Sequence, residues 1–246
     1  MDNKNPILTI TIPVLNEEDS LVNKITTLQS YIDKYLLNKM TVEIVIADNG
    51  SSDKTSELGK MLASENENIL FMRTKKKGVG LALKESWQRY KSDFMGYMDL
   101  DLSTDLSHIE EAIKIISTSE YEIVSGSRLM KESDVIGRTF LRSICSIIFN
   151  KLLRMLFKVR FSDGMCGFKF FQLDAMDKLN GPRAMHSNGW FFATEFLILS
   201  ERANIKVKDL PIKWTNDPSS KVKIVRLAIL YLFEMMALKR RLDSKK

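Results

Sequence analysis

Short apolar runs alternate with helix-patterned stretches along the first half of the chain, and this alternation most constrains the fold. The runs occupy residues 7–15, 42–47, 70–72, 94–98 and 121–126. Between the first two, apolar side chains recur at helical spacing: Leu21, Ile25, Leu28 and Ile32. Strands and helices joined in this order by short connections form parallel sheets covered by helices on both faces. We therefore predict an α/β fold with a mostly parallel, twisted sheet.

Polar residues gather where the predicted strands end. In parallel sheets, ligands bind beyond the carboxyl ends of the strands, and these ends meet at one edge. The clusters are Asn16-Glu17, Asp48-Asn49, Asp99-Leu100-Asp101 and Ser127-Arg128. Their common position predicts a ligand site of nucleotide type at that edge.

Asp99 and Asp101 lie one residue apart at a strand end, so their carboxylates point the same way. Oxygen ligands grouped like this suit Mg²⁺ or Mn²⁺, which are bound by carboxylates together with substrate phosphates. A metal ion there would neutralise a diphosphate leaving group. The alternative is that such a pair serves only strand-end solvation and helix capping, a role that Asp105 also fits.

The formal net charge of +6 favours an anionic partner, such as a nucleotide, a lipid phosphate, an acidic membrane or a nucleic acid. The chain carries no recognised nucleic-acid motif, which argues against the last of these. Its two cysteines, Cys145 and Cys166, are interpreted as reduced, buried thiols of a cytosolic protein. The first residues lack the apolar core of a signal peptide, and no uncharged run reaches membrane-spanning length.

Two later segments combine apolar and basic residues. Residues 138–160 read as a basic amphipathic helix or helix pair, and residues 222–238 as a helix that is apolar nearly all round. Such helices either face the protein core or lie on an anionic membrane surface, and both interpretations stay open. Between them we expect extended structure over 161–173, a helix over 190–202 and a strand over 205–212.

In order along the chain, five motifs resemble the inverting family 2 glycosyltransferases, which have the GT-A (Rossmann-like) fold. They are residues 12–17 (Ile-Pro-Val-Leu-Asn-Glu), 48–53 (Asp-Asn-Gly-Ser-Ser-Asp), 78–80 (Gly-Val-Gly), 98–103 (Met-Asp-Leu-Asp-Leu-Ser) and 126–128 (Gly-Ser-Arg). The resemblance covers residues 7–223. Within the family, the chain is most similar to the dolichyl- or polyprenyl-phosphate glucosyltransferases and the dolichol-phosphate mannose synthases.

The resemblance implies a nucleotide-sugar site and a metal site. The expected nucleotide-sugar contacts are Pro13, Leu15, Glu17, Ala47, Asp48, Asn49, Lys77, Gly78, Asp99, Leu100 and Lys221. The expected ligands of Mg²⁺ or Mn²⁺ are Asp99, Asp101 and Ser103.

The implied acceptor is a polyprenyl or dolichyl phosphate, whose oxygen would attack the anomeric carbon in line and invert it. A phosphate is already an anion at neutral pH, so catalysis would rest on positioning and charge neutralisation. Asp101, Arg128 and Arg142 are the expected catalytic residues, and Ser146 joins the two arginines around the acceptor phosphate. Taken singly, each arginine could equally form a surface salt bridge.

Three weaker sugar contacts are also expected: Asp163, Glu195 and Trp214. A salt bridge on a helix face would explain Glu195 equally well.

Three departures from the family pattern bear on the donor. Leu15 and Thr215 replace a tyrosine and an arginine that are common in the mannose synthases, and Asn49 replaces a second aspartate. The Asn49 amide could accept from the base or donate to it, so the nucleobase stays open. These departures, with residues 162–169, favour glucose over mannose and UDP-glucose over GDP-mannose.

We thus expect a catalytic domain over residues 1–221, made of a nucleotide-sugar half (1–128) and an acceptor half (129–221) with amphipathic helices at about 136–160. Residues 222–246 would form a C-terminal amphipathic helix and basic tail. The expected protein is a metal-dependent hexosyltransferase held peripherally on the cytoplasmic face of a membrane. A second copy of the chain, or an integral membrane protein, stays open as a partner.

Three other functions stay open. A family 2 transferase could act on a non-lipid or glycan acceptor in surface polysaccharide synthesis, in which case Asp163 or Glu195 would have to serve as the base. A nucleic-acid-binding module and a non-catalytic membrane scaffold are the remaining alternatives.

Overall fold

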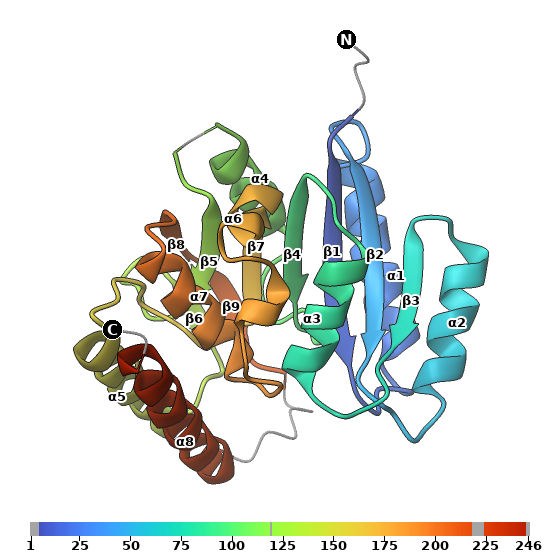
Figure 1. Ribbon diagram of the computed structural model, residues 1–246. Coiled ribbons are helices and arrows are strands. Elements are labelled where there is room, and N and C mark those ends of the chain that lie inside the picture. Colours follow the sequence, from blue (N-terminus) through green and yellow to red (C-terminus); the bar gives the residue numbers. More distant parts are fainter. Residues whose placement is uncertain (1–4, 119, 218–223, 245–246) are drawn as a thin grey trace.

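The computed structural model describes residues 5–118, 120–217 and 224–244 (Figure 1). The strands are β1 (Ile7–Val14), β2 (Thr41–Asp48), β3 (Ile69–Arg73), β4 (Phe94–Met98), β5 (Ile123–Ser127), β6 (Asp134–Ile136), β7 (Phe168–Gln172), β8 (Val207–Pro211) and β9 (Lys213–Thr215). The helices are α1 (Leu21–Tyr35), α2 (Thr55–Glu65), α3 (Val79–Arg89), α4 (Ser107–Thr118), α5 (Phe140–Phe157), α6 (Leu173–Lys178), α7 (Phe192–Arg202) and α8 (Ile224–Asp243), with a 3₁₀ turn at Pro182–Ala184.

The main sheet of the described chain has the strand order β3-β2-β1-β4-β7-β5-β8. Its neighbours pair in parallel, except that β7 runs antiparallel to both β4 and β5. The predicted mostly parallel sheet is therefore confirmed. A second, small sheet joins β6 to β9 in parallel beside its edge.

Helices cover both faces of the sheet because each buries one apolar stripe against it. The predicted stripe of α1, from Leu21 to Ile32, is fully buried in a core shared with α2 and α4. The opposite core is built on Trp87 of α3, Phe171 of β7 and Phe196 of α7.

Helices α5 and α8 pack side by side and contribute their buried faces to this second core (Figure 1). The ring of Tyr231 on α8 joins them, because its centroid lies 5.1 Å from that of Phe149 on α5. The predicted basic helix over 138–160 is thus one helix, which ends where Lys158 adopts a left-handed backbone (φ 56°). None of the helices in the described ranges combines the length and apolarity needed to cross a membrane.

The predicted extended stretch over 161–173 contains β7, and the short helix α6 that follows it was not predicted. Both cysteines are free thiols, as expected. Burial is confirmed for Cys166, whereas Cys145 on α5 is only half-buried.

Candidate active site at the carboxyl ends of the strands

The carboxyl ends of β1 and β2 meet in register, with Pro13 beside Ala47 and Val14 beside Asp48. The side chain of Ala47 is fully buried, in a small cluster with Met72 and Ala82. The side chain of Leu100 is likewise buried, in the larger core under α1. Because both side chains face inward, the predicted contacts of Ala47 and Leu100 with a nucleotide sugar would involve their backbone groups, and they stay predictions.

The carboxylate of Asp48 is fully buried and holds the loop that follows β2. Its Oδ1 accepts a hydrogen bond from the Ser51 amide at 2.8 Å, and its Oδ2 accepts one from the Ser56 hydroxyl. Arg73, which the sequence analysis did not single out, lies 3.7 Å from Oδ2. Asp48 thus shapes the site, and its carboxylate is not presented to a ligand.

Asn49 links this loop to the glycine loop before α3. Its side-chain oxygen accepts a hydrogen bond from the Gly78 amide, which leaves the Asn49 NH₂ as a donor. Gly78 has φ 156°, and a Cβ there would lie 2.5 Å from the carbonyl oxygen of Asn188. Lys77 is exposed beside it. The structure therefore brings Asn49, Lys77 and Gly78 together, as predicted.

The loop after β1 is tied to the loop after β2. Asn16, with a left-handed backbone (φ 55°), accepts a hydrogen bond from the Ser52 amide through its Oδ1 at 2.8 Å. The Glu17 amide donates to the Thr55 hydroxyl at 2.8 Å. These bonds hold Glu17 and the exposed side chain of Leu15 at the sheet edge, where they were expected.

The turn after β4 presents the paired carboxylates. Asp101 Oδ1 accepts a hydrogen bond from the Ser103 amide at 2.9 Å, and Leu102 between them has a left-handed backbone (φ 53°). Asp99 Oδ1 and Ser103 Oγ are buried and have no hydrogen-bond partner within the described residues. Burial, and then the charge of Asp101, raise the pKa of Asp99 to about 7.

These oxygens fit a divalent cation. A buried carboxylate oxygen without a partner costs free energy unless a cation or proton compensates it. The capping role belongs to Asp105, whose Oδ1 accepts a hydrogen bond from the Ser107 amide at the start of α4. Asp99, Asp101 and Ser103 therefore stay together as the candidate ligands of Mg²⁺ or Mn²⁺, and substrate oxygens would complete the shell.

Gly167 lies directly against the Asp99 side chain. The Asp99 amide donates to the Gly167 carbonyl at 3.2 Å, and a Cβ at Gly167 would lie only 2.0 Å from Asp99 Oδ2. Only glycine leaves the Asp99 carboxylate in its observed place. The sequence alone did not indicate this role, because the contact joins residues far apart in the chain.

Lys24 on α1 fixes the same turn from the other side. Its ammonium group donates to the Asp101 carbonyl at 2.7 Å and lies 3.5 Å from a carboxylate oxygen of Asp217. Asp217 directly precedes residues 218–223, so the predicted contact by Lys221 lies outside the described residues.

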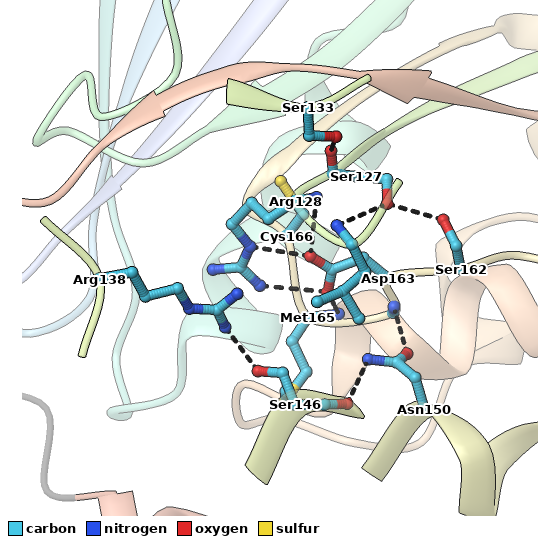
Figure 2. A network of polar contacts seen from close by, with 12 residues as sticks. Ser127, Arg128, Ser133, Arg138, Ser146, Asn150, Ser162, Asp163, Met165 and Cys166 are labelled. Atoms are coloured by element: carbon cyan, nitrogen blue, oxygen red, sulfur yellow. Dashed lines mark hydrogen bonds and ion pairs between the residues drawn. The ribbon is translucent and has the colours of Figure 1, made fainter. Parts of the chain in front are cut away.

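Arg128, at the end of β5, is held by Asp163 (Figure 2). Its Nε and Nη2 donate to the two oxygens of the Asp163 carboxylate at 2.8 and 3.1 Å. Burial alone would raise the pKa of Asp163, but the charge and hydrogen bonds of Arg128 outweigh it and lower this pKa to about 2. The predicted sugar contact by Asp163 stays a prediction, and the structure shows this carboxylate engaged by Arg128. The ion pair uses the Nε and Nη2 groups of Arg128, and Nη1 has no hydrogen-bond partner among the described residues.

Arg142 and Ser146 lie one turn apart on α5. Arg142 Nη1 donates to the side-chain oxygen of Asn216 at 2.9 Å, and Ser146 Oγ accepts a hydrogen bond from Arg138 Nη2 at 2.5 Å. The structure thus brings Arg142 and Ser146 beside Arg128, as expected. It adds Arg138, which the sequence analysis counted only among the basic residues of the amphipathic segment.

Of the two remaining expected sugar contacts, Glu195 is turned away from the strand ends. Its carboxylate accepts from the backbone amides of His186 and Ser187 and forms an ion pair with Arg241 of α8. These contacts are in keeping with the alternative of a salt bridge, and the predicted sugar contact by Glu195 stays a prediction. Trp214 on β9 lies within the site, with its ring centroid 5.7 Å from the Arg128 guanidinium.

Together, the parallel sheet, the paired carboxylates at one strand end and the arginines at another form a polar site at the carboxyl ends of the strands, where ligands bind in α/β proteins. Residues 9–179 match the family described as Glycosyl transferase family 2, and the chain belongs to that family.

Curated relatives support this assignment. The chain is 30% identical over 220 residues to glycosyltransferase AglD of Haloferax volcanii, covering 89% of this chain but only 35% of that protein. It is 27% identical over 264 residues to a dolichyl-phosphate beta-glucosyltransferase of Dictyostelium discoideum, covering 97% and 80% of the two chains. The corresponding enzyme of Saccharomyces cerevisiae is 26% identical over 242 residues, covering 91% and 71%. The family and these relatives support a hexosyltransferase.

Among solved structures, the chain resembles glucosyl-3-phosphoglycerate synthase of Mycobacterium tuberculosis in complex with Mn²⁺, UDP and glucosyl-3-phosphoglycerate. The TM-score is 0.70 at 14% sequence identity, over 94% of this chain and 79% of that one. At this identity the likeness shows the fold alone, and it confirms the expected GT-A-like architecture.

Proposed function

We propose that this enzyme transfers glucose, with inversion, from a nucleotide sugar to a polyprenyl or dolichyl phosphate at a membrane surface, in a metal-dependent reaction. The observation that carries the proposal is that both residues considered as candidate bases, Asp163 and Glu195, are already engaged in ion pairs. Asp163 is paired with Arg128, and Glu195 is held by two backbone amides and Arg241. A hydroxyl acceptor would need a free base, whereas a phosphate oxygen needs none. The structure therefore favours a phosphate acceptor over a glycan hydroxyl.

The donor would lie across the ends of β1, β2 and β4, in the half of the chain up to residue 128. Leu15, Glu17 and the free NH₂ of Asn49 border the proposed nucleoside position, with Lys77 and Gly78 alongside. The ammonium group of the exposed Lys77 would attract a phosphate of the donor through its positive charge. UDP-glucose is the proposed donor, in keeping with the beta-glucosyltransferase relatives.

Asp99, Asp101 and Ser103 would hold Mg²⁺ or Mn²⁺. The bound cation would stabilise the negative charge that develops on the leaving diphosphate. Lys24 and Gly167 keep this carboxylate turn in place, through the Asp101 carbonyl and the Asp99 carboxylate respectively. The catalytic contribution of the protein is therefore mainly fixed geometry and charge.

The acceptor half would meet the membrane through α5 and α8. On α5, exposed apolar residues recur on one face, from Phe140 through Ile148 to Met155, opposite the buried face of Phe149 and Leu153. On α8 the exposed apolar residues follow the same spacing: Ile229, Leu232, Phe233 and Met236. Apolar stripes beside basic residues are typical of helices that lie in the interface of an anionic bilayer.

A donor screen tests the proposal. The purified chain, Mg²⁺ or Mn²⁺ and a short polyprenyl phosphate would be incubated with UDP-, GDP- and dTDP-sugars, with Asp101→Asn as the control. We expect lipid-linked glucose from UDP-glucose, and its loss in the variant. Metal-dependent release of nucleoside diphosphate without a lipid product would show a different acceptor. The absence of both turnover and donor binding would refute the enzymatic assignment.

A further inference from the structure

Three guanidinium groups meet between the end of β5 and the start of α5, but only one of them has a carboxylate partner. Arg128 is neutralised by Asp163 in a two-point ion pair. Arg138 and Arg142 have neutral partners, the Ser146 hydroxyl and the Asn216 amide oxygen. No carboxylate lies within 4.0 Å of either group among the residues that the structure describes.

Arg138 is built into this site and does not project into solvent. Arg138 precedes α5, and its side chain extends forward along the helix, so that the guanidinium reaches the Ser146 hydroxyl about two turns later (Figure 2). Burial, and then the nearby charge of Arg128, lower the pKa of Arg138 to about 10. A cation held in such surroundings is stabilised when an anion binds beside it.

The charge balance indicates which anion fits. Asp163 neutralises Arg128, whereas the direct partners of Arg138 and Arg142 among the described residues are neutral. A phosphate monoester carries close to two negative charges above its second pKa of about 6. Two guanidinium groups can also each donate twice to its oxygens.

We propose that Arg138, together with Arg142, binds the acceptor phosphate and selects a dianionic phosphate monoester. The sequence analysis placed Arg128, Arg142 and Ser146 around this phosphate, and in the structure Arg128 is held by Asp163 through Nε and Nη2. The inference rests on the proposed function, because it names a residue through which that function recognises its acceptor. It adds Arg138 to the predicted site and extends the recognition from the end of β5 further toward α5.

Steady-state kinetics with Arg138→Gln and Arg138→Lys test the inference. A short, water-soluble prenyl phosphate would be used with saturating donor, so that membrane docking does not enter. We expect Arg138→Gln to raise the KM for the prenyl phosphate by about 10- to 100-fold, as for a lost charge-assisted hydrogen bond, and Arg138→Lys to raise it less. The KM for the donor should not change. Arg154→Gln, at an exposed arginine of the same helix, is the matched control.

Calorimetric binding without donor gives a second readout. The ligands are the same prenyl phosphate and its monomethyl ester, which carries one negative charge. The wild-type chain should bind the dianion more tightly than the ester, and Arg138→Gln should abolish most of that preference. If Arg138 had only a structural role, Arg138→Gln would lower the affinity for both ligands by the same factor.

An unchanged acceptor KM, or an unchanged preference for the dianion, would overturn the inference. Should Arg138→Gln fail to fold, Arg138→Lys decides by the same two measurements. A wild-type chain that binds the prenyl phosphate through Arg138 but transfers no sugar to it would contradict the proposed function and support the inference.

Discussion

Replacing Gly167 by alanine would move the Asp99 carboxylate, a candidate metal ligand, without breaking the fold. The new Cβ would lie 2.0 Å from Asp99 Oδ2 and 2.6 Å from its Oδ1, whereas ordinary van der Waals contact begins at 3.4 Å. The carboxylate must therefore shift by about 1.4 Å. Because the clashing atoms belong to the Asp99 side chain and not to the backbone, rotation of this side chain can relieve the clash, and we expect a stability cost of about 1–3 kcal/mol. A displacement of about 1 Å at a reacting centre lowers the rate by about 100-fold.

The assay is metal-dependent release of nucleoside diphosphate, with Mn²⁺ or Mg²⁺ titrated from zero. Gly167→Ala should need more metal for half-maximal activity and have a lower kcat, while its urea midpoint falls only modestly below that of the wild type. Gly189→Ala is the matched control, because a Cβ there meets no atom within 4 Å. A Gly167→Ala enzyme with normal metal activation and normal kcat would refute the assigned place of Asp99 in the site.

The remaining predictions concern stability, thiol reactivity and the membrane. Asp163→Asn leaves a buried guanidinium uncompensated and should lower the free energy of unfolding by about 3–5 kcal/mol in urea denaturation, so a loss below about 1 kcal/mol would contradict the pairing. Burial raises the pKa of Cys166 to about 11, so at pH 8 iodoacetamide should modify native Cys145 first and Cys166 only after unfolding, as read by mass spectrometry. Phe233→Glu should weaken co-sedimentation of the protein with anionic vesicles, because Phe233 is an exposed apolar residue of α8. Leu37→Glu should not, because Leu37 is equally an exposed apolar residue but lies outside α8. Equal sedimentation of the two variants would count against membrane docking through α8.

The sequence predicts most of the fold because the parallel strands are continuous apolar runs and the helices carry clear stripes, as in α1. It also predicts that the polar ends of these strands share one edge, which places Asp99, Asp101 and Arg128 in one site. These are consequences of local patterns and of the topology that follows from them.

The pairings across long sequence distances could not be predicted from local patterns. Asp163 and Arg128 are 35 residues apart, and neither the direction of β7 nor the pairing of β6 with β9 is encoded in a short segment. The same is true of Asp48, whose burial depends on Arg73 and on two serines of the next turn. Residue type therefore indicated the location of these groups correctly, but not which partner each would take.

Strand β7 also sets the distance between the carboxylate turn after β4 and the arginine end of β5. Neighbouring strands lie about 4.8 Å apart, so its insertion between β4 and β5 separates the carboxylate turn from the arginine end by about 10 Å. The loop before β7 supplies Gly167, which packs against Asp99 in the carboxylate turn. The same loop supplies Asp163, whose carboxylate neutralises Arg128 at the arginine end. A slip of this strand would displace Gly167 and Asp163 together, so the spacing between the carboxylate turn and the arginine end is set by the sheet itself.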